Sequence, residues 1–123
     1  MDTFIISDNP AITNILIEII PPAYKTHHFI FQQDFYLEEN YPKNPKIIII
    51  VSTKNETWGW WITGELIFKF PEANFLIIQH NNDLKCSGKL SDKIFLFADS
   101  IENLTTQVPC ILKDFFPKRL PRI

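Results

Sequence analysis

Three apolar segments of this chain end in side chains that could take part in chemistry. Asp8 follows a short apolar run near the amino terminus, Ser52 and Thr53 follow a run of isoleucines, and His80 follows a third run. A carboxylate, two hydroxyls and an imidazole are the groups that acid–base catalysis and polar ligand binding use. If the three runs are parallel strands, their carboxyl ends meet at one edge of a sheet. One hypothesis is therefore a catalytic or small-molecule-binding domain that uses these four residues.

Other kinds of chemical site find less support in the sequence. His27 and His28 have no third metal ligand nearby, and Cys86 and Cys110 match no metal-binding spacing, so we expect no metal site and reduced thiols. Ser52 is not part of a Gly-x-Ser-x-Gly motif, and no glycine-rich loop follows a strand, which argues against a serine hydrolase and against nucleotide binding. The sequence predicts no cofactor and no enzymatic activity.

The composition is that of an ordinary globular domain. Of 123 residues, 46% are hydrophobic and 21% are charged, and the formal net charge is -2. This balance predicts neither a nucleic-acid partner nor binding to an anionic membrane, and the apolar runs are too short to span a bilayer. No basic region precedes the first strand, so we expect a cytoplasmic protein. We expect one domain at residues 1–116 and a short basic tail at residues 117–123.

Residues 46–53 carry the strongest structural signal, because five consecutive β-branched apolar residues lie within them. Such a run cannot alternate between core and solvent, so both faces of the strand must be covered. That pattern is typical of a central strand in a parallel sheet flanked by helices.

Strand and helix patterns alternate along the rest of the chain. Besides the isoleucine run, strands are expected at 3–7, 27–32, 74–78 and 93–97. Helices are expected at 10–20, 34–41, 53–70 and 100–116, with a kink or break near 106–107 caused by Pro109. The polar segment 81–91 predicts a loop in place of a fourth helix. This order predicts an α/β, flavodoxin-like fold, with a five-stranded parallel sheet in the order 2-1-3-4-5 and helices on both faces.

Two segments, together with the order of elements, resemble the receiver domain of response regulators. Residues 6–10, Ile-Ser-Asp-Asn-Pro, are similar to the point where the first receiver strand ends in an acidic pair and enters the first helix. Residues 45–51 are similar to the third strand, which ends in the phosphorylated aspartate. Forming an acyl phosphate there requires Mg²⁺ held by carboxylates, and the phosphoryl group is then bound by a hydroxyl and a lysine.

The resemblance places mostly the wrong residue types at the receiver site. The positions are Ser7 and Asp8 for the acidic pair, Val51 beside Ser52 for the phosphoacceptor, Gln79 for the hydroxyl, and Phe97 or Ala98 for the lysine. Valine cannot accept a phosphoryl group, and a single carboxylate holds Mg²⁺ poorly. The resemblance therefore implies a pseudo-receiver, similar to those of cyanobacterial clock proteins, some of which also have a loop in place of the fourth helix.

Two groups of aromatic residues are candidates for contact with a partner. Trp58, Trp60 and Trp61 open the third helix, and Phe95 and Phe115 belong to the fifth strand and the last helix. Trp60 points roughly 100° away from Trp61 in a helix, so all three rings cannot easily be buried against the sheet. One interpretation is that two tryptophans pack in the core and one lies flat on the surface; the other is that the aromatic group anchors a protein partner. The resemblance implies a non-catalytic signalling module of a two-component system, which docks to a protein partner or forms a homodimer. Loss of the fourth helix would leave the face near Phe95 and Phe115 open for self-association.

Overall fold

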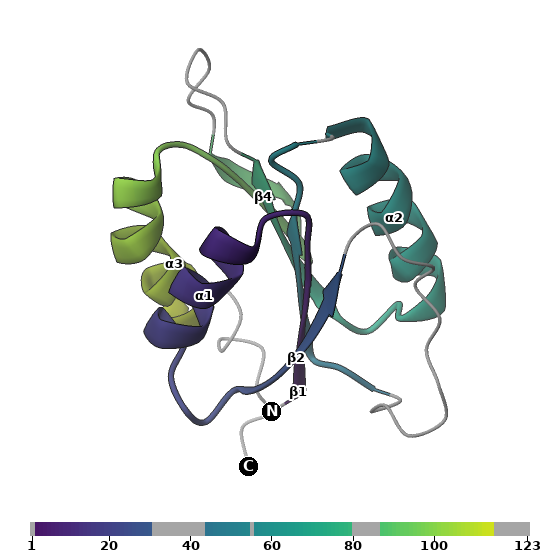
Figure 1. The fold of residues 1–123 in the computed structure, drawn as a ribbon. Helices are drawn as coiled ribbons and strands as arrows, with labels where there is room; N and C mark the ends of the chain where they lie inside the picture. Colours follow the sequence, from purple (N-terminus) through teal and green to yellow (C-terminus); the bar gives the residue numbers. More distant parts are fainter. Residues whose placement is uncertain (1, 31–43, 55, 80–86, 115–123) are drawn as a thin grey trace.

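A central sheet with helices on both faces makes up the computed structural model, which describes residues 2–30, 44–54, 56–79 and 87–114 (Figure 1). In chain order the elements are β1 (Asp2–Ser7), α1 (Pro10–Ile19), β2 (Lys25–Ile30), β3 (Ile47–Val51), α2 (Glu56–Lys69), β4 (Asn74–Gln79), β5 (Gly88–Ser91), β6 (Ile94–Ala98) and α3 (Ile101–Asp114). Helices α1 and α3 cover one face, and α2 covers the other. None of the helices in these ranges is long and apolar enough to cross a membrane.

The sheet has the order β2-β1-β3-β4-β6-β5. Its first five members are parallel, and β6 is the strand that the sequence predicts as the fifth, so the predicted order of the parallel strands is confirmed. The predicted total of five strands is wrong, because β5 adds an antiparallel member at the edge. The fold is therefore α/β with a mostly parallel sheet and three described helices.

Part of the loop predicted at residues 81–91 is in fact the strand β5. It pairs with β6 through a tight turn at Asp92 and Lys93, with Gly88 opposite Leu96 and Ser91 opposite Ile94. Its side chains are mostly exposed, so no apolar pattern marks it in the sequence. An edge strand of this kind is held by backbone hydrogen bonds to its neighbour, which amino-acid patterning does not report.

The isoleucine run forms β3, and both of its faces are buried as predicted. Ile47, Ile49 and Val51 face the core beneath α1 and α3, whereas Ile48 and Ile50 face the core beneath α2. The strand lies between β1 and β4, at the centre of the parallel part of the sheet. Its apolar composition is explained by a separate hydrophobic core on each side.

We expect a kink or a break near residues 106–107, and the break is wrong, because helix α3 is continuous from Ile101 to Asp114. Pro109 removes one backbone donor, but the neighbouring turns bury Leu104, Val108 and Leu112 against the sheet. Burial of this stripe offsets the missing hydrogen bond. The predicted helix at 34–41, together with His80, Phe115 and the tail at 117–123, lies outside the described residues.

Candidate functional site

The carboxylate of Asp8 is fully engaged at the carboxyl edge of the sheet. Its Oδ1 accepts hydrogen bonds from the backbone N–H of Thr53 at 3.1 Å and from the Thr53 hydroxyl at 3.0 Å. Its Oδ2 accepts from the backbone N–H of Lys54 at 2.7 Å. The carboxylate thus binds the loop after β3 to the loop after β1, which is a structural use of the only acidic group carried over from the receiver pattern.

The position of Asp8 follows from the pairing of the two strands. Ser7 lies opposite Val51 in the parallel register, and the N–H of Asp8 donates to the Val51 carbonyl at 3.2 Å. The next residue on each strand therefore leaves the sheet beside the other. Asn9 adds to the junction, since its side-chain N–H donates to the Thr53 hydroxyl at 3.3 Å while its Oδ1 caps α1.

Ser7, the other member of the degenerate acidic pair, is held within its own turn. Its hydroxyl donates to the Asn9 carbonyl at 2.9 Å and accepts from the Asn9 N–H at 3.0 Å. The polar groups of Ser7 at the carboxyl end of β1 are therefore used in hydrogen bonds within the turn that follows the strand.

Ser52 is wholly buried and lies against helix α2. Its backbone N–H donates to the Ile78 carbonyl at 2.8 Å, which continues the sheet one residue beyond β3. A Cβ added at Gly59 would overlap the Cβ and Oγ of Ser52, so the helix backbone closes directly over this side chain. No substrate can reach the Ser52 hydroxyl in this arrangement.

The remaining positions of the degenerate receiver site belong to the core or its margin. Val51 and Phe97 are both fully buried in the core beneath α1 and α3. Gln79 is mostly buried, and its Nε2 has no hydrogen-bond partner among the described residues. Valine and phenylalanine suit the apolar surroundings that they occupy, whereas an aspartate or a lysine there would be buried among hydrocarbon.

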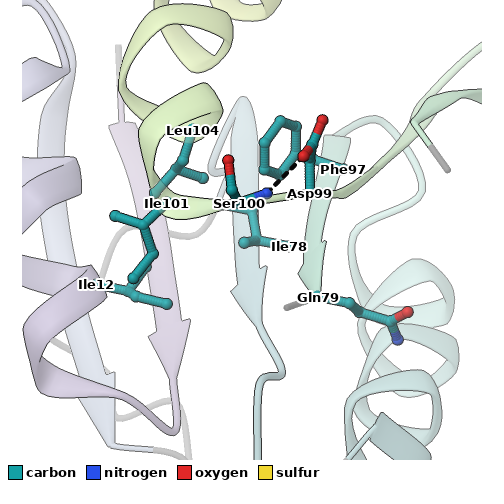
Figure 2. A pocket seen from close by; sticks show the side chains of 8 residues that line it. All are labelled: Ile12, Ile78, Gln79, Phe97, Asp99, Ser100, Ile101 and Leu104. Carbon is teal, nitrogen blue, oxygen red and sulfur yellow. Dashed lines mark hydrogen bonds between the residues drawn. The ribbon is translucent and has the colours of Figure 1, made fainter. Parts of the chain in front are cut away.

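A small cavity lies at this edge between the end of the sheet and the start of α3 (Figure 2). Its volume is about 10 Å³, and it is lined by Ile12, Ile78, Gln79, Phe97, Asp99, Ser100, Ile101 and Leu104. Figure 2 shows the Gln79 side chain pointing away from the apolar residues that line it, and the Asp99 carboxylate accepting from the Ser100 N–H at 2.6 Å. Such a volume admits about one water molecule, whereas ligand pockets measure roughly 300–1,000 Å³.

Comparisons of the chain with protein-family models, with curated proteins and with solved structures find no match. Functional argument therefore depends on the geometry of the described residues.

Three of the four residues proposed as a catalytic cluster are described, and these three form no open site. Asp8 and Thr53 are in contact, Ser52 is buried beside them, and His80 lies outside the described residues. In the part of the chain that the structure describes, no three His, Cys, Asp or Glu side chains gather as metal ligands would. The Nε2 of His27, on β2, lies 3.2 Å from the carboxylate of Asp2 at the opposite end of β1.

The tryptophans are arranged differently from the prediction. Trp60 is 41% exposed and Trp61 is 59% exposed, so the expectation that two of the three tryptophans pack in the core is wrong. The Trp58 side chain and Phe115 lie outside the described part, and Phe95 packs half-buried against the core beneath α1 and α3. The inward side of α2 is taken by other residues, namely Gly59, Ile62, Thr63 and Leu66, and the buried Phe70 follows the end of the helix.

Sequence reasoning missed Phe68, whose side chain is 81% exposed on the same outward side of α2. The signal was present in the spacing, because Trp60, Gly64 and Phe68 recur every four residues and therefore share one face of a helix. Together with Trp61 and Glu65 these residues line an open hollow of about 390 Å³.

Removing the Asp8 carboxylate is expected to destabilise the domain. We predict that Asp8→Ala lowers the free energy of unfolding by about 1.5–3 kcal/mol, because the loop loses hydrogen bonds to a charged acceptor. Asp8→Asn should recover part of the loss, and hydrogen exchange at the Thr53 and Lys54 amides should quicken. The measurement is urea unfolding followed by tryptophan fluorescence.

The matched control is Asp92→Ala, which removes an exposed carboxylate from the β5–β6 turn. Its free energy of unfolding should change by less than about 0.5 kcal/mol. Equal losses in the two variants would contradict the structural role of Asp8.

Proposed function

We propose that this chain is a non-catalytic protein-interaction module, a flavodoxin-like pseudo-receiver that has lost phosphotransfer. The observation that carries the proposal is the engagement of both Asp8 oxygens by the Thr53–Lys54 loop. A carboxylate has about four lone-pair directions, and N–H and O–H donors occupy three of those of Asp8, which leaves little for Mg²⁺. The burial of Val51 at the phosphoacceptor position points the same way.

The architecture is compatible with this reading. The parallel strands run 2-1-3-4 and continue with β6, and helices cover both faces, as in the flavodoxin-like order. The hairpin β5–β6 occupies the chain segment where a receiver has its fourth helix and fifth strand. The face that receivers use for signalling is therefore built differently here, which directs attention to α2 as the binding surface.

On this proposal the domain works by docking, as a cytoplasmic component of a signalling system. Since no phosphoryl group switches it, the occupancy of the complex is set by the concentrations of the two partners and their affinity. The catalytic alternative, built on Asp8, Ser52, Thr53 and His80, is opposed by the complete burial of the Ser52 side chain. The small cavity at this edge lends it no support, since Asp8, Ser52 and Thr53 do not line that cavity.

The test is exposure of the purified protein to Mg²⁺ and acetyl phosphate, followed by intact-mass spectrometry. We expect no covalent adduct and no change of tryptophan fluorescence on adding Mg²⁺. A phosphorylatable receiver in the same mixture serves as the positive control. A stable adduct on Asp8 or Ser52 would overturn the proposal and favour the catalytic alternative.

A further inference from the structure

Helix α2 carries three large, exposed aromatic side chains on its outward face. Trp60, Trp61 and Phe68 stand on it, and their exposed fractions are 41%, 59% and 81%. Singly exposed hydrophobic residues are ordinary, but three aromatic rings around one hollow form a contiguous patch. We refer to Trp60, Trp61, Gly64, Glu65 and Phe68 as the α2 face.

Three residues of the α2 face are spaced symmetrically along the helix. Gly64 lies at its centre, with Trp60 four residues before it and Phe68 four residues after it. A Cβ placed on Gly64 would meet no described atom within 4 Å, so the helix backbone forms the bottom of the hollow between the aromatic rings. A glycine at this point lets another helix approach closely, while the aromatic rings rise on either side.

We propose that the occupant of the α2 face is a second copy of this chain, with the two α2 helices packed antiparallel about a two-fold axis at Gly64. The two-fold axis relates each position to the one equally far from Gly64 in the opposite direction. Trp60 of one copy therefore meets Phe68 of the other, and the same contact occurs twice. An isologous interface requires this self-complementarity, whereas an unrelated partner requires no symmetry about Gly64.

The area of the face indicates a small interface, typical of weak and transient association. A large aromatic side chain offers roughly 150–250 Å², so the exposed parts of the three rings come to about 400 Å² in each copy. The pair would bury about 800 Å² from the rings, less than the roughly 1,200–2,000 Å² of a stable complex. We therefore expect a reversible dimer with a dissociation constant on the order of 100 μM.

Glu65 provides a second test of the antiparallel arrangement. It follows Gly64 directly and lines the hollow, and the two-fold axis places the Glu65 carboxylates of both copies on the same side of the helix pair. Like charges across an interface oppose association. Glu65→Gln should therefore lower the dissociation constant of the dimer about three-fold. Added salt should reduce the difference in dissociation constant between this variant and the unmodified protein.

This inference rests on the proposed function as a docking module and names its partner. The two fail separately. A phosphoryl adduct would overturn the proposed function and leave a dimer intact, whereas a protein that stays monomeric would overturn the dimer and leave the absence of phosphotransfer intact.

The first experiment is sedimentation velocity over a range of protein concentrations. The weight-average mass should rise from the monomer value of 14.4 kDa towards twice that value. Phe68→Ser should weaken association at least ten-fold without affecting the fold, because the ring is mostly in solvent. The control Ile17→Ser, which likewise replaces an exposed apolar residue of another helix, α1, by serine, should leave the association unchanged. A monomer at every concentration, or a dimer indifferent to Phe68→Ser, overturns the proposal.

The second experiment tests the symmetry itself by disulfide formation in a variant carrying Cys86→Ser and Cys110→Ser. Gly64→Cys places the two thiols beside the axis, within the Cα separation of about 4.4–6.8 Å that a disulfide allows. Thr57→Cys, seven residues away on the same exposed side, places its two copies about 21 Å apart along the helices. Gly64→Cys should cross-link and Thr57→Cys should not. Equal cross-linking of the two variants rules out the antiparallel arrangement about Gly64.

Discussion

Replacing Gly59 by alanine is expected to lower the free energy of unfolding by about 2–3 kcal/mol, although alanine is the better helix former. Gly59 lies in the first turns of α2, where its Cα faces the buried Ser52 side chain after β3. An added Cβ would overlap the Cβ of Ser52 as well as its Oγ. Rotation of the hydroxyl cannot relieve the contact with Cβ, so the helix and the sheet must move apart.

Two further variants show whether the loss arises from this contact. Ser52→Gly removes both overlapping atoms, so the double variant with Gly59→Ala should regain most of the loss, with a coupling energy of about 2 kcal/mol by urea unfolding. Gly64→Ala in the same helix is the matched control, since a Cβ there meets no described atom, and it should stabilise the protein by about 0.5–1 kcal/mol. If the two alanine variants are equally stable, the close approach of α2 to Ser52 is not real.

The sequence predicts the centre of this fold well because the centre is set by burial. Residues 47–51 had to be covered on both faces, and the alternation of elements around them left few topologies. The start of α1 at Pro10 is likewise predicted, because the preference for proline in the first turn of a helix depends on local sequence alone.

The edge strand β5 and the contacts of Asp8 could not be predicted from the sequence, because hydrogen bonds of backbone groups determine both. β5 is held by pairing with β6, and its exposed side chains carry no periodic pattern. Asp8 is engaged by N–H groups of Thr53 and Lys54, 45 and 46 residues further along the chain. Every residue but proline has such a donor, so sequence alone does not reveal which carboxylate will find one.

Pattern reasoning also misplaced the tryptophans, for a reason visible in α2. The helix keeps small residues, Gly59 and Thr63, on its inward side where it approaches the sheet most closely. The prediction places two tryptophans in the core, whereas Trp60 and Trp61 both lie on the outward side. The inward position beside Ser52 belongs to Gly59, where even a Cβ would overlap the serine side chain, so no indole ring fits at that point.

Restoring an aspartate at the phosphoacceptor position should damage the protein and leave it unable to take up a phosphoryl group. Val51 is fully enclosed in the core beneath α1 and α3, next to residues such as Ile49 and Phe97. We expect Val51→Asp to lower the free energy of unfolding by about 3–5 kcal/mol at neutral pH, because a carboxylate there has neither solvent nor a cation. On the proposed function, the strand end therefore differs from a receiver site in space and polarity as well as in one side chain.

The dependence of this loss on pH identifies its cause. Burial raises the pKa of the introduced carboxyl in the folded protein above its value of about 3.9 in the unfolded chain. Below that value both states are protonated and the penalty is smallest; as the pH rises, the unfolded state ionises first and the variant loses stability. Val51→Thr, which has nearly the same shape and no charge, should lose about 1–3 kcal/mol with no such trend. Urea unfolding of both variants between pH 4 and pH 8 makes the comparison. The contrary outcome is a Val51→Asp protein that keeps its stability across this range and is phosphorylated by acetyl phosphate. That result would mean that the strand end is open to solvent. It would also mean that a single residue separates this site from a working receiver site.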